Sequence, residues 1–153
     1  YIHYLDDAVF FVAIGNGSVR RKIQTMLVEN GAKMVNLIHP NAVVAEDVRM
    51  GVGTVIMAGA VINPGAVLGS GTIINTCASV DHDCRIGDYV HVAVGARICG
   101  TVQIGDDTWV GAGATVIHST SVCAGCMIGA GAVVVNNIQK QGVYLGVPAK
   151  EKN

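Results

Sequence analysis

The hydrophobic positions of this chain repeat with a period of six residues. From Ile38 onward, every sixth residue is aliphatic for seventeen consecutive positions. Since Val, Ile, Leu and Met make up roughly a third of the chain, chance would place only about six such residues on the series. The series comprises Ile38, Val44, Met50, Ile56, Ile62, Leu68, Ile74, Val80, Ile86, Val92, Ile98, Ile104, Val110, Val116, Val122, Ile128 and Val134.

A second series lies two residues before the first, and all its members are small or β-branched. It comprises Ala42, Val48, Thr54, Ala60, Ala66, Thr72, Ala78, Cys84, Val90, Ala96, Val102, Thr108, Ala114, Thr120, Cys126 and Ala132. Residues two apart in a strand face the same way, so both series point inward and the residue between them points outward. The other three positions form a turn. Three such hexads make a triangular coil of about 18 residues, and about five to six stacked coils bury a continuous core. The pattern predicts a parallel β-helix over residues 37–135.

The outward residues sort into three faces at 18-residue spacing. The first face carries Val55, Ile73, His91, Trp109 and Met127; the second carries Val61, Ser79, Arg97, Thr115 and Val133; the third carries Arg49, Val67, Arg85, Gln103 and Ser121. The first face is apolar apart from His91. An exposed apolar face of this size usually marks an interface, so we expect it to pack in a cyclic homotrimer.

Residues 1–36 follow a different pattern. The apolar run 8–14 is typical of a buried parallel strand, and residues 15–17 form a turn that could bring backbone amides near a phosphate. We expect Ser18 to cap a helix that ends at Glu29. Its apolar face would hold Val19, Ile23, Met26 and Leu27.

This strand, turn and helix are typical of the second half of a small nucleotide-binding α/β domain. One strand cannot form a sheet by itself, so we expect further residues upstream of residue 1 in the natural protein. The tail, residues 136–153, breaks the six-residue repeat.

Composition limits the function classes. The formal net charge is -1, which indicates neither nucleic acid nor a membrane surface as partner. No apolar run of about 18 residues occurs, so no membrane span is expected, and the first residues do not resemble a signal peptide. The five cysteines are odd in number and irregularly spaced, which fits reduced thiols in the cytoplasm.

His82 is the candidate for acid–base chemistry. By its place in the repeat it lies in a turn, at the corner between the second and third faces, and points outward. A neutral imidazole is suited to take a proton from an amine or a hydroxyl. Asp83 or Asp81 could orient the ring and raise its basicity. A solvated turn histidine without function fits the spacing equally well.

Other reactive side chains favour structural interpretations. His118 lies at the same corner as His82 but two coils away, too far to share a proton. No histidine pair has the spacing of metal ligands on one element, so we expect no metal site. Cys123 and Cys126 form a C-x-x-C sequence, yet Cys126 belongs to the inward series and no second pair exists.

Several motifs together resemble the hexapeptide-repeat acyltransferases, in particular the sugar acetyltransferases. The motifs are Ala13-Ile14-Gly15-Asn16 followed by Arg20 and Arg21, Leu37-Ile38-His39-Pro40, Val80-Asp81-His82-Asp83, Ile86-Gly87-Asp88 with His91, and Gly146-Val147-Pro148-Ala149-Lys150. The chain is similar to the UDP-N-acetylbacillosamine pathway N-acetyltransferases and to the sialic-acid O-acetyltransferases. The resemblance covers nearly the whole chain and implies that the β-helix is left-handed.

The resemblance also implies a role for particular residues. The family's catalytic base falls on His82 and its acidic neighbour on Asp83, where the bacillosamine-pathway enzyme has Glu. The acetyl-CoA contacts fall on His91, Ala112 and Ala130. The contact to the UDP-sugar falls on Gly15, whereas the family's first strand and glycine-rich loop have no counterpart here.

Three functions follow as hypotheses. The first is direct acetyl transfer from acetyl-CoA to the 4-amino group of a UDP-linked amino sugar, with His82 as general base, no metal, and active sites between the subunits of a homotrimer. The second is O-acetylation of a sialic acid or another sugar by the same base. The third is a β-helix without catalytic activity that serves as a scaffold, against which the His82–Asp83 pair argues.

Overall fold

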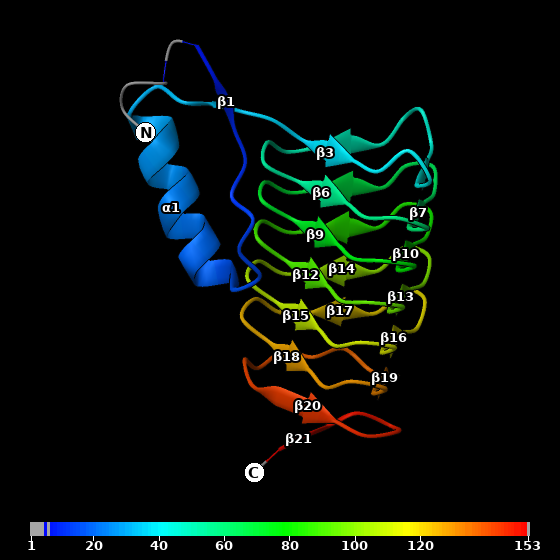
Figure 1. The fold of residues 1–153 in the computed structure, drawn as a ribbon. Helices are drawn as coiled ribbons and strands as arrows, with labels where there is room; N and C mark the ends of the chain where they lie inside the picture. Colours follow the sequence, from blue (N-terminus) through cyan, green and yellow to red (C-terminus); the bar gives the residue numbers. More distant parts are fainter. Residues whose placement is uncertain (1–4, 6, 153) are drawn as a thin grey trace.

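The computed structural model describes residue 5 and residues 7–152 of the chain. Residues 1–4 and 6, which open the predicted domain 1–36, and residue 153 lie outside the described residues. The described part consists of a tall parallel β-helix of about six turns with a small unit beside it that holds one helix (Figure 1). The predicted fold class, mainly β with a β-helix, is therefore confirmed.

Each face of the β-helix is one sheet of very short strands. The first face holds β3 (Leu37–Ile38), β6 (Val55–Ile56), β9 (Ile73–Ile74), β12 (His91–Val92), β15 (Trp109–Val110) and β18 (Met127–Ile128). The second holds β4 (Val43–Val44), β7 (Val61–Ile62), β10 (Ser79–Val80), β13 (Arg97–Ile98), β16 (Thr115–Val116) and β19 (Val133–Val134). The third holds β5 (Arg49–Met50), β8 (Val67–Leu68), β11 (Arg85–Ile86), β14 (Gln103–Ile104) and β17 (Ser121–Val122).

Parallel pairing at 18-residue spacing builds these sheets. Val55 pairs with Ile73, and His91 pairs with Trp109. Both inward series therefore stack into one core, in which every member of the aliphatic series from Ile56 to Val134 is at most 3 % exposed. Ile38 is 47 % exposed because the first coil has no neighbour above it.

The turns share one backbone conformation. A residue with positive φ recurs every sixth position from Gly53 to Gly131. Six of these positions hold other residues, namely Cys77, Asp83, Tyr89, Thr101, Asp107 and Ser119. Such a conformation strains a non-glycine residue. The six-residue repeat therefore determines the turn conformation so strongly that even Asp83 and Tyr89 adopt positive φ.

The tail continues the first-face sheet. In it, β20 (Val143–Leu145) pairs with β18, and β21 (Lys150–Glu151) folds back antiparallel on β20. Ile138 bridges to Val122 and joins the core. The last coil is thereby covered.

The N-terminal unit is a separate small layer. Its strands β1 (Val9–Phe10) and β2 (Lys33–Met34) pair in parallel, and α1 (Gly17–Glu29) lies between them in sequence. Its own core contains Val12, Leu27 and Ala32. Gly31 adopts positive φ just after the helix, as a helix stop requires.

The predicted cap of α1 is wrong. The Asn16 side chain accepts the Val19 N–H and is the N-cap, whereas Ser18 lies inside the first turn and donates its hydroxyl to Asn16 Oδ1. Asn and Ser are about equally good caps, so the sequence did not separate the two positions.

The predicted apolar face of α1 is also wrong in part. The buried residues are Arg20, Gln24 and Leu27, while Val19 and Met26 are exposed. Leu27 and Ile23 pack on the unit's own strand layer. The side of α1 that contacts the β-helix is polar and holds Arg20 and Gln24.

Helix α1 lies along the corner between the third and first faces of the β-helix (Figure 1). Gln24 donates to Val52 O, Arg20 donates to Gly71 O and Tyr89 O, and Arg21 pairs with Asp107. These acceptors lie on successive coils. Because one helical turn rises about 5.4 Å and neighbouring strands lie about 4.8 Å apart, the helix can contact one coil per turn.

The first face is covered in part by this chain itself, which corrects the reason given above for a trimer. Val55, Ile73 and His91 are 8 %, 7 % and 7 % exposed, and residues 11–15 lie over them. Trp109 and Met127 stay 37 % and 50 % exposed. The apolar patch that suggested a partner subunit is mainly the surface on which the N-terminal unit packs.

Candidate active site

His82 and Asp83 form a hydrogen-bonded pair at the corner between the second and third faces. His82 Nδ1 lies 2.9 Å from Asp83 Oδ2, and the two side chains are 57 % and 65 % exposed. Since Nδ1 donates to the carboxylate, Nε2 remains free to accept a proton. The hydrogen bond to Asp83 raises the pKa of His82, and the Asp81 carboxylate acts in the same direction.

Two glycines make room for this pair. A methyl group at Gly100, one coil further on, would lie 2.4 Å from His82 Nε2. A methyl group at Gly65, one coil earlier, would lie 2.5 Å from Asp83 Oδ1. The side chains of the pair therefore lie flat along the corner, against bare backbone.

The Asp81 carboxylate fixes the turn that carries His82. Its Oδ1 accepts from the His82 backbone N–H at 2.8 Å and from Asn63 Nδ2 at 2.7 Å. The hydrogen bond from Asn63, followed by that from the His82 backbone, lowers the pKa of Asp81. Asp81 thus stays ionised and holds the backbone, while Asp83 holds the ring.

His91 lies in a different environment on the first face. It is 7 % exposed, its Nε2 is 3.1 Å from Asn75 Nδ2, and its ring lies 4.3 Å from the Trp109 ring. With the Asn75 amide as donor, His91 accepts at Nε2 and carries its proton on Nδ1. Burial lowers the pKa of His91, and the Arg20 guanidinium adds to this. His91 is therefore held neutral.

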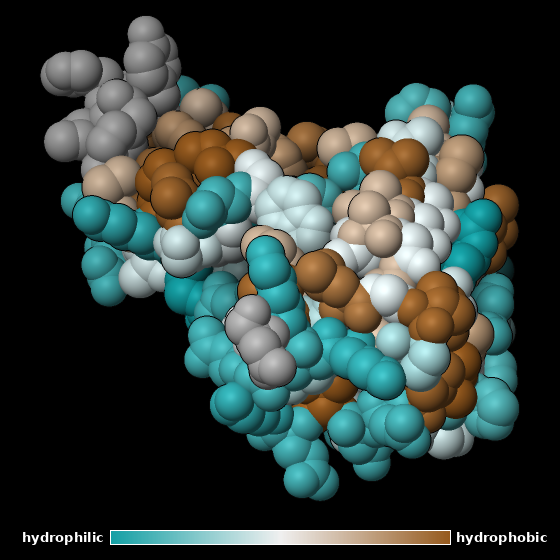
Figure 2. Space-filling model, turned by 90° about the horizontal axis from the view of Figure 1, so that it is seen from below, coloured by the Kyte–Doolittle hydropathy of each residue, from teal (hydrophilic) through white to brown (hydrophobic). Residues whose placement is uncertain are grey.

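A half-open hollow of about 190 Å³ lies between His91 and the N-terminal unit. It is lined by residues 11–15 on one side and by Val55, Met57, Ile73, Asn75 and His91 on the other. Figure 2 shows the molecular surface hollowed between the N-terminal unit and the coils, with hydrophobic side chains at its border. Gly15, the predicted contact to the sugar nucleotide, lies next to the His91 ring. A Cβ added at Gly15 would lie 4.0 Å from His91 Cε1.

Ala112 and Ala130 lie at a third place, the corner between the first and second faces. They occupy equivalent positions on successive coils, and the Gly131 N–H donates to Ala112 O at 2.9 Å. Both are exposed. The small side chains leave the backbone of this corner open along two coils.

The structure therefore brings together some of the predicted site residues and not others. His91 and Gly15 face the same hollow, and the corner with Ala112 borders the first face beside them. His82 and Asp83 lie on the opposite edge of the second face. One copy of the described chain does not place the candidate base next to the candidate acetyl-CoA contacts.

Sequence reasoning missed three residues that shape these places, namely Gly100, Asn75 and Arg20. Gly100 lies 18 residues after His82, so the coil length alone could have identified it as the neighbour beneath the ring. Asn75 lies 16 residues before His91, in the corner of the preceding coil. Arg20 belongs to one of the motifs that carry the family resemblance, but its burial gave no signal, because a helical arginine is usually solvated.

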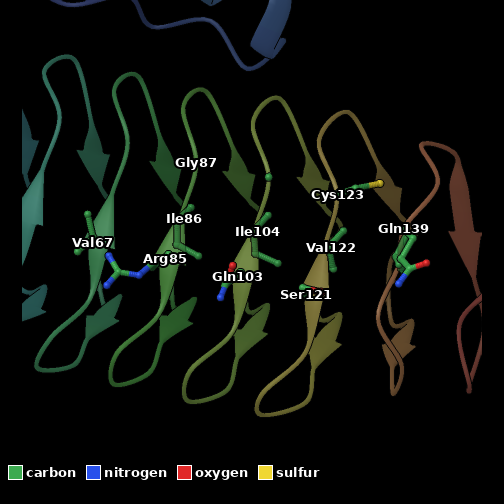
Figure 3. A pocket seen from close by; sticks show the side chains of 12 residues that line it. Val67, Arg85, Ile86, Gly87, Gln103, Ile104, Ser121, Val122, Cys123 and Gln139 are labelled. Carbon is green, nitrogen blue, oxygen red and sulfur yellow. The ribbon is translucent and has the colours of Figure 1, made fainter.

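A groove of about 550 Å³ on the third face contains none of the predicted catalytic, acetyl-CoA or sugar-nucleotide contacts. Figure 3 shows its lining, with Val67, Arg85, Gln103 and Ser121 on successive coils and Gln139 beyond them. It is an open surface of alternating polar and aliphatic side chains, and it carries no constellation of catalytic groups.

The remaining candidates can be placed as well. Cys123 Sγ and Cys126 Sγ are 3.5 Å apart as free thiols, and burial raises the pKa of Cys126 to about 11. Among the described residues, no group of three or more His, Cys, Asp or Glu is arranged to hold a metal ion. That part of the chain also has no helix with the length and apolar character needed to cross a bilayer.

Comparison with known proteins gives a consistent set of relatives. Residues 101–136 match the family model of the bacterial transferase hexapeptide (six repeats). The structure is similar to that of PerB from Caulobacter crescentus in complex with CoA and GDP-perosamine, with a TM-score of 0.97 and 39% sequence identity over 99% of this chain and 74% of that chain.

Two curated proteins match shorter segments. One is the GDP-perosamine N-acetyltransferase of Escherichia coli O157:H7, which is 33% identical over 55% of this chain and 38% of its own length. The other is the UDP-N-acetylbacillosamine N-acetyltransferase of Bacillus subtilis (strain 168), which is 41% identical over 35% of this chain and 25% of its own length. The aligned segments thus span well under half of either relative.

Proposed function

The chain belongs to the family of bacterial hexapeptide transferases, and from this premise we propose that it transfers the acetyl group of acetyl-CoA to an amine of a nucleotide-linked amino sugar. The observation that carries the proposal is the similarity over 99% of the chain to a protein whose structure holds CoA and GDP-perosamine together. The acceptor amine is the one at C4 of the sugar, as the family resemblance implies.

The nucleotide of the acceptor sugar is the first specificity to test. One curated relative is named for GDP-perosamine and aligns with 55% of the chain, and PerB, whose structure holds GDP-perosamine, aligns with nearly the whole chain. The relative named for a UDP-sugar aligns with 35% of the chain. That relative has the higher sequence identity, 41% against 33%, so the GDP-linked sugar and the UDP-linked sugar expected from the sequence are both substrates to test.

His82 acts as the general base in the proposed reaction. The sugar amine attacks the thioester carbonyl of acetyl-CoA, so that a C–N bond forms and the C–S bond breaks. His82 Nε2 accepts the proton that the amine loses and passes it to the departing CoA thiolate. The hydrogen bond from Nδ1 to Asp83 at 2.9 Å stabilises the imidazolium in between.

Acetyl-CoA binds along the corner with Ala112 and Ala130 and reaches His91, and the sugar nucleotide contacts Gly15. The arrangement within one chain supports a site shared between two copies, because the base and the acetyl-CoA corner lie on opposite edges of the second face. Packing second faces around a threefold axis would bring these edges together. We therefore retain the homotrimer, with the second face at its centre.

The test is an acetyl-transfer assay with GDP- and UDP-linked 4-amino sugars and with a sialic acid, each with acetyl-CoA. We expect acetylation of a nucleotide-linked amine, and His82→Ala should lower kcat by about 10²–10⁴-fold. Glu46→Gln, which removes an exposed carboxylate at another turn, is the matched control and should leave kcat unchanged.

Two results would contradict the proposal. Acetylation of the sialic acid alone would favour O-acetyl transfer. Absence of acetyl-CoA binding, measured by calorimetry, would favour the scaffold. Normal turnover of His82→Ala would show that His82 is not the general base, although the proposed acetyl-transfer reaction would still stand.

A further inference from the structure

Arg20 is a buried cation in an unusual setting. Its side chain is 0 % exposed. No carboxylate of the described residues forms an ion pair with it, in contrast to Arg21, which pairs with Asp107 at 2.8 Å. Burial lowers the pKa of Arg20, although a guanidinium remains charged at neutral pH.

The charge is satisfied by four backbone carbonyls. Nη1 donates to Ile14 O at 2.7 Å and to Gly15 O at 2.8 Å. Nε donates to Gly71 O at 2.6 Å, and Nη2 donates to Tyr89 O at 2.8 Å. The planar fork of a guanidinium suits this divergent set of acceptors, whereas the compact ammonium of lysine does not.

These four acceptors belong to three separate segments. Ile14 and Gly15 form the loop between β1 and α1. Gly71 and Tyr89 lie on successive coils, in the turns that lead to β9 and β12, and β12 carries His91. One side chain therefore joins the loop of the N-terminal unit to the two coils that form the floor beneath it.

The surroundings restrain Gly15 itself little, although Val12 and Ile14 pack in the core of the N-terminal unit. A Cβ added at Gly15 would meet only His91 Cε1 at 4.0 Å, and the hollow of about 190 Å³ separates the remaining residues 11–14 from the first face. Among the described residues, His91 Nδ1 has no hydrogen-bond partner. Packing therefore holds Val12 and Ile14, and the hydrogen bonds from Arg20 hold the backbone carbonyls of Ile14 and Gly15 beside His91.

We propose that Arg20 is a positioning residue that fixes the Ile14–Gly15 loop against His91 and so sets the geometry of the acceptor side of the active site. This inference rests on the proposed function, in which Gly15 contacts the sugar nucleotide. It assigns Arg20 no contact with the substrate. Its effect is on the binding of the sugar nucleotide rather than on the base at His82.

The kinetic test compares Arg20→Lys and Arg20→Gln with Arg21→Lys as the matched control. Both Arg20 variants should raise the KM for the nucleotide sugar by about 10- to 100-fold, the effect of losing hydrogen bonds to a charged group. The KM for acetyl-CoA should rise less than that for the nucleotide sugar, since of the three proposed acetyl-CoA contacts only His91 lies beside the loop and Ala112 and Ala130 lie away from it. Arg21→Lys should leave both constants near those of the wild type.

A spectroscopic test needs no activity. Trp109 is the single tryptophan and lies 4.3 Å from His91, so its fluorescence, which an imidazolium quenches, follows the titration of His91. Arg20 is the charged group that acts on His91; its other neighbours, Asn75, Trp109 and Gly15, are neutral. Arg20→Gln should shift the midpoint to higher pH, and Arg20→Lys, which keeps the charge, should shift it less.

A third measurement uses the unmodified protein, in case the variants do not fold. The Arg20 Nε–H should exchange slowly with solvent in NMR spectra, because it is buried and donates to Gly71 O. A rapidly exchanging Nε–H would overturn the inference. So would an Arg20→Lys variant whose KM for the nucleotide sugar stays within about twofold of the wild type.

The inference and the proposed function can fail separately. If the wild-type protein transfers no acetyl group, the proposed function fails, while the fluorescence titration and the Nε–H exchange still test the arrangement around Arg20. If the wild-type protein is active and the KM for acetyl-CoA rises as much as that for the nucleotide sugar, Arg20 serves general stability and the positioning role is wrong.

Discussion

At the scale of single residues, the candidate site depends on where side chains are absent. The His82 ring rests on Gly100 and the Asp83 carboxylate on Gly65. Of these two glycines only Gly65 has positive φ. Gly100 is therefore required for space alone, and it offers a substitution without backbone strain.

Gly100→Ala should displace the His82 imidazole, because the added Cβ would lie 2.4 Å from Nε2. We expect kcat to fall by at least about tenfold while the KM for acetyl-CoA changes little, since a misplaced base loses much of its effect. Steady-state kinetics would measure this. Gly142→Ala, where φ is not positive and an added Cβ comes no closer than 3.3 Å to the Glu151 side chain, is the control for an inserted methyl group. Equal kcat in Gly100→Ala and the wild type would contradict the orientation of His82.

Asp83→Asn tests the electrostatic effect of the Asp83 carboxylate on His82. His82 must be neutral to accept a proton, so activity is lost as the pH falls through the pKa of His82. Because the hydrogen bond to Asp83 raises that pKa, its removal should move the acid limb of the kcat/KM profile to lower pH. At high pH the loss in kcat should be smaller than the about 10²–10⁴-fold loss expected for removal of the base. An acid limb that does not move would show that Asp83 leaves the basicity of His82 unchanged.

At the scale of elements, the two parts of the chain are stabilised in opposite ways. Each strand of the β-helix contributes one inward aliphatic residue to a continuous stack. Helix α1 instead meets the β-helix through Arg20, Gln24 and Arg21, which bind backbone carbonyls and a carboxylate of successive coils. The helix is joined to the coils by directional polar contacts and to its own strands by apolar ones.

Strand β14 has one outward and one inward residue, so the contribution of the core stack to stability can be tested by substituting two neighbouring residues. Ile104 is 3 % exposed and lies between Ile86 and Val122, whereas its neighbour Gln103 points outward. Ile104→Ala should lower the free energy of unfolding by about 2–5 kcal/mol, because the 18-residue ladder prevents the neighbouring coils from closing the cavity. Gln103→Ala should stay within about 0.5 kcal/mol of the wild type. Urea denaturation followed by circular dichroism measures both, and equal losses would contradict the stack.

At the scale of the whole molecule, the second face separates the candidate base from the acetyl-CoA corner. His82 lies at one edge of that face and Ala112 at the other, so the site we propose needs residues from two copies. The first face is not available for this contact over Val55, Ile73 and His91, since residues 11–15 cover it.

Subunit mixing tests the shared site. His82→Ala lacks the base, and Ala112→Trp should block the acetyl-CoA corner, so each variant alone should be nearly inactive. When the two are unfolded together and reassembled as trimers, about one quarter of the sites should combine an intact base with an intact corner. Recovery of activity in the mixture would be measured against each variant reassembled alone. No recovery, or a monomeric mass in solution, would contradict a site between subunits.

The sequence alone determined the β-helix, its inward residues and the corner on which His82 lies. The reason is that a strict six-residue period leaves no choice of register: once Ile38 faces inward, the facing of every residue to Val134 follows. The same arithmetic could have placed Gly100 beneath His82.

Only the tertiary structure decided how the N-terminal unit sits. The sequence favoured an apolar helix face with Val19 and Met26, and a subunit partner for the first face. Instead, the turns at the corner of the coils present the carbonyls of Gly71 and Tyr89, for which no backbone donor exists among the described residues, and that of Val52, which also accepts the Gly71 N–H; polar side chains of α1 bind all three. Free backbone carbonyls cannot be recognised from the pattern of side chains along the sequence. The burial of Arg20, and with it the position of Gly15 beside His91, therefore could not be predicted from the residues themselves.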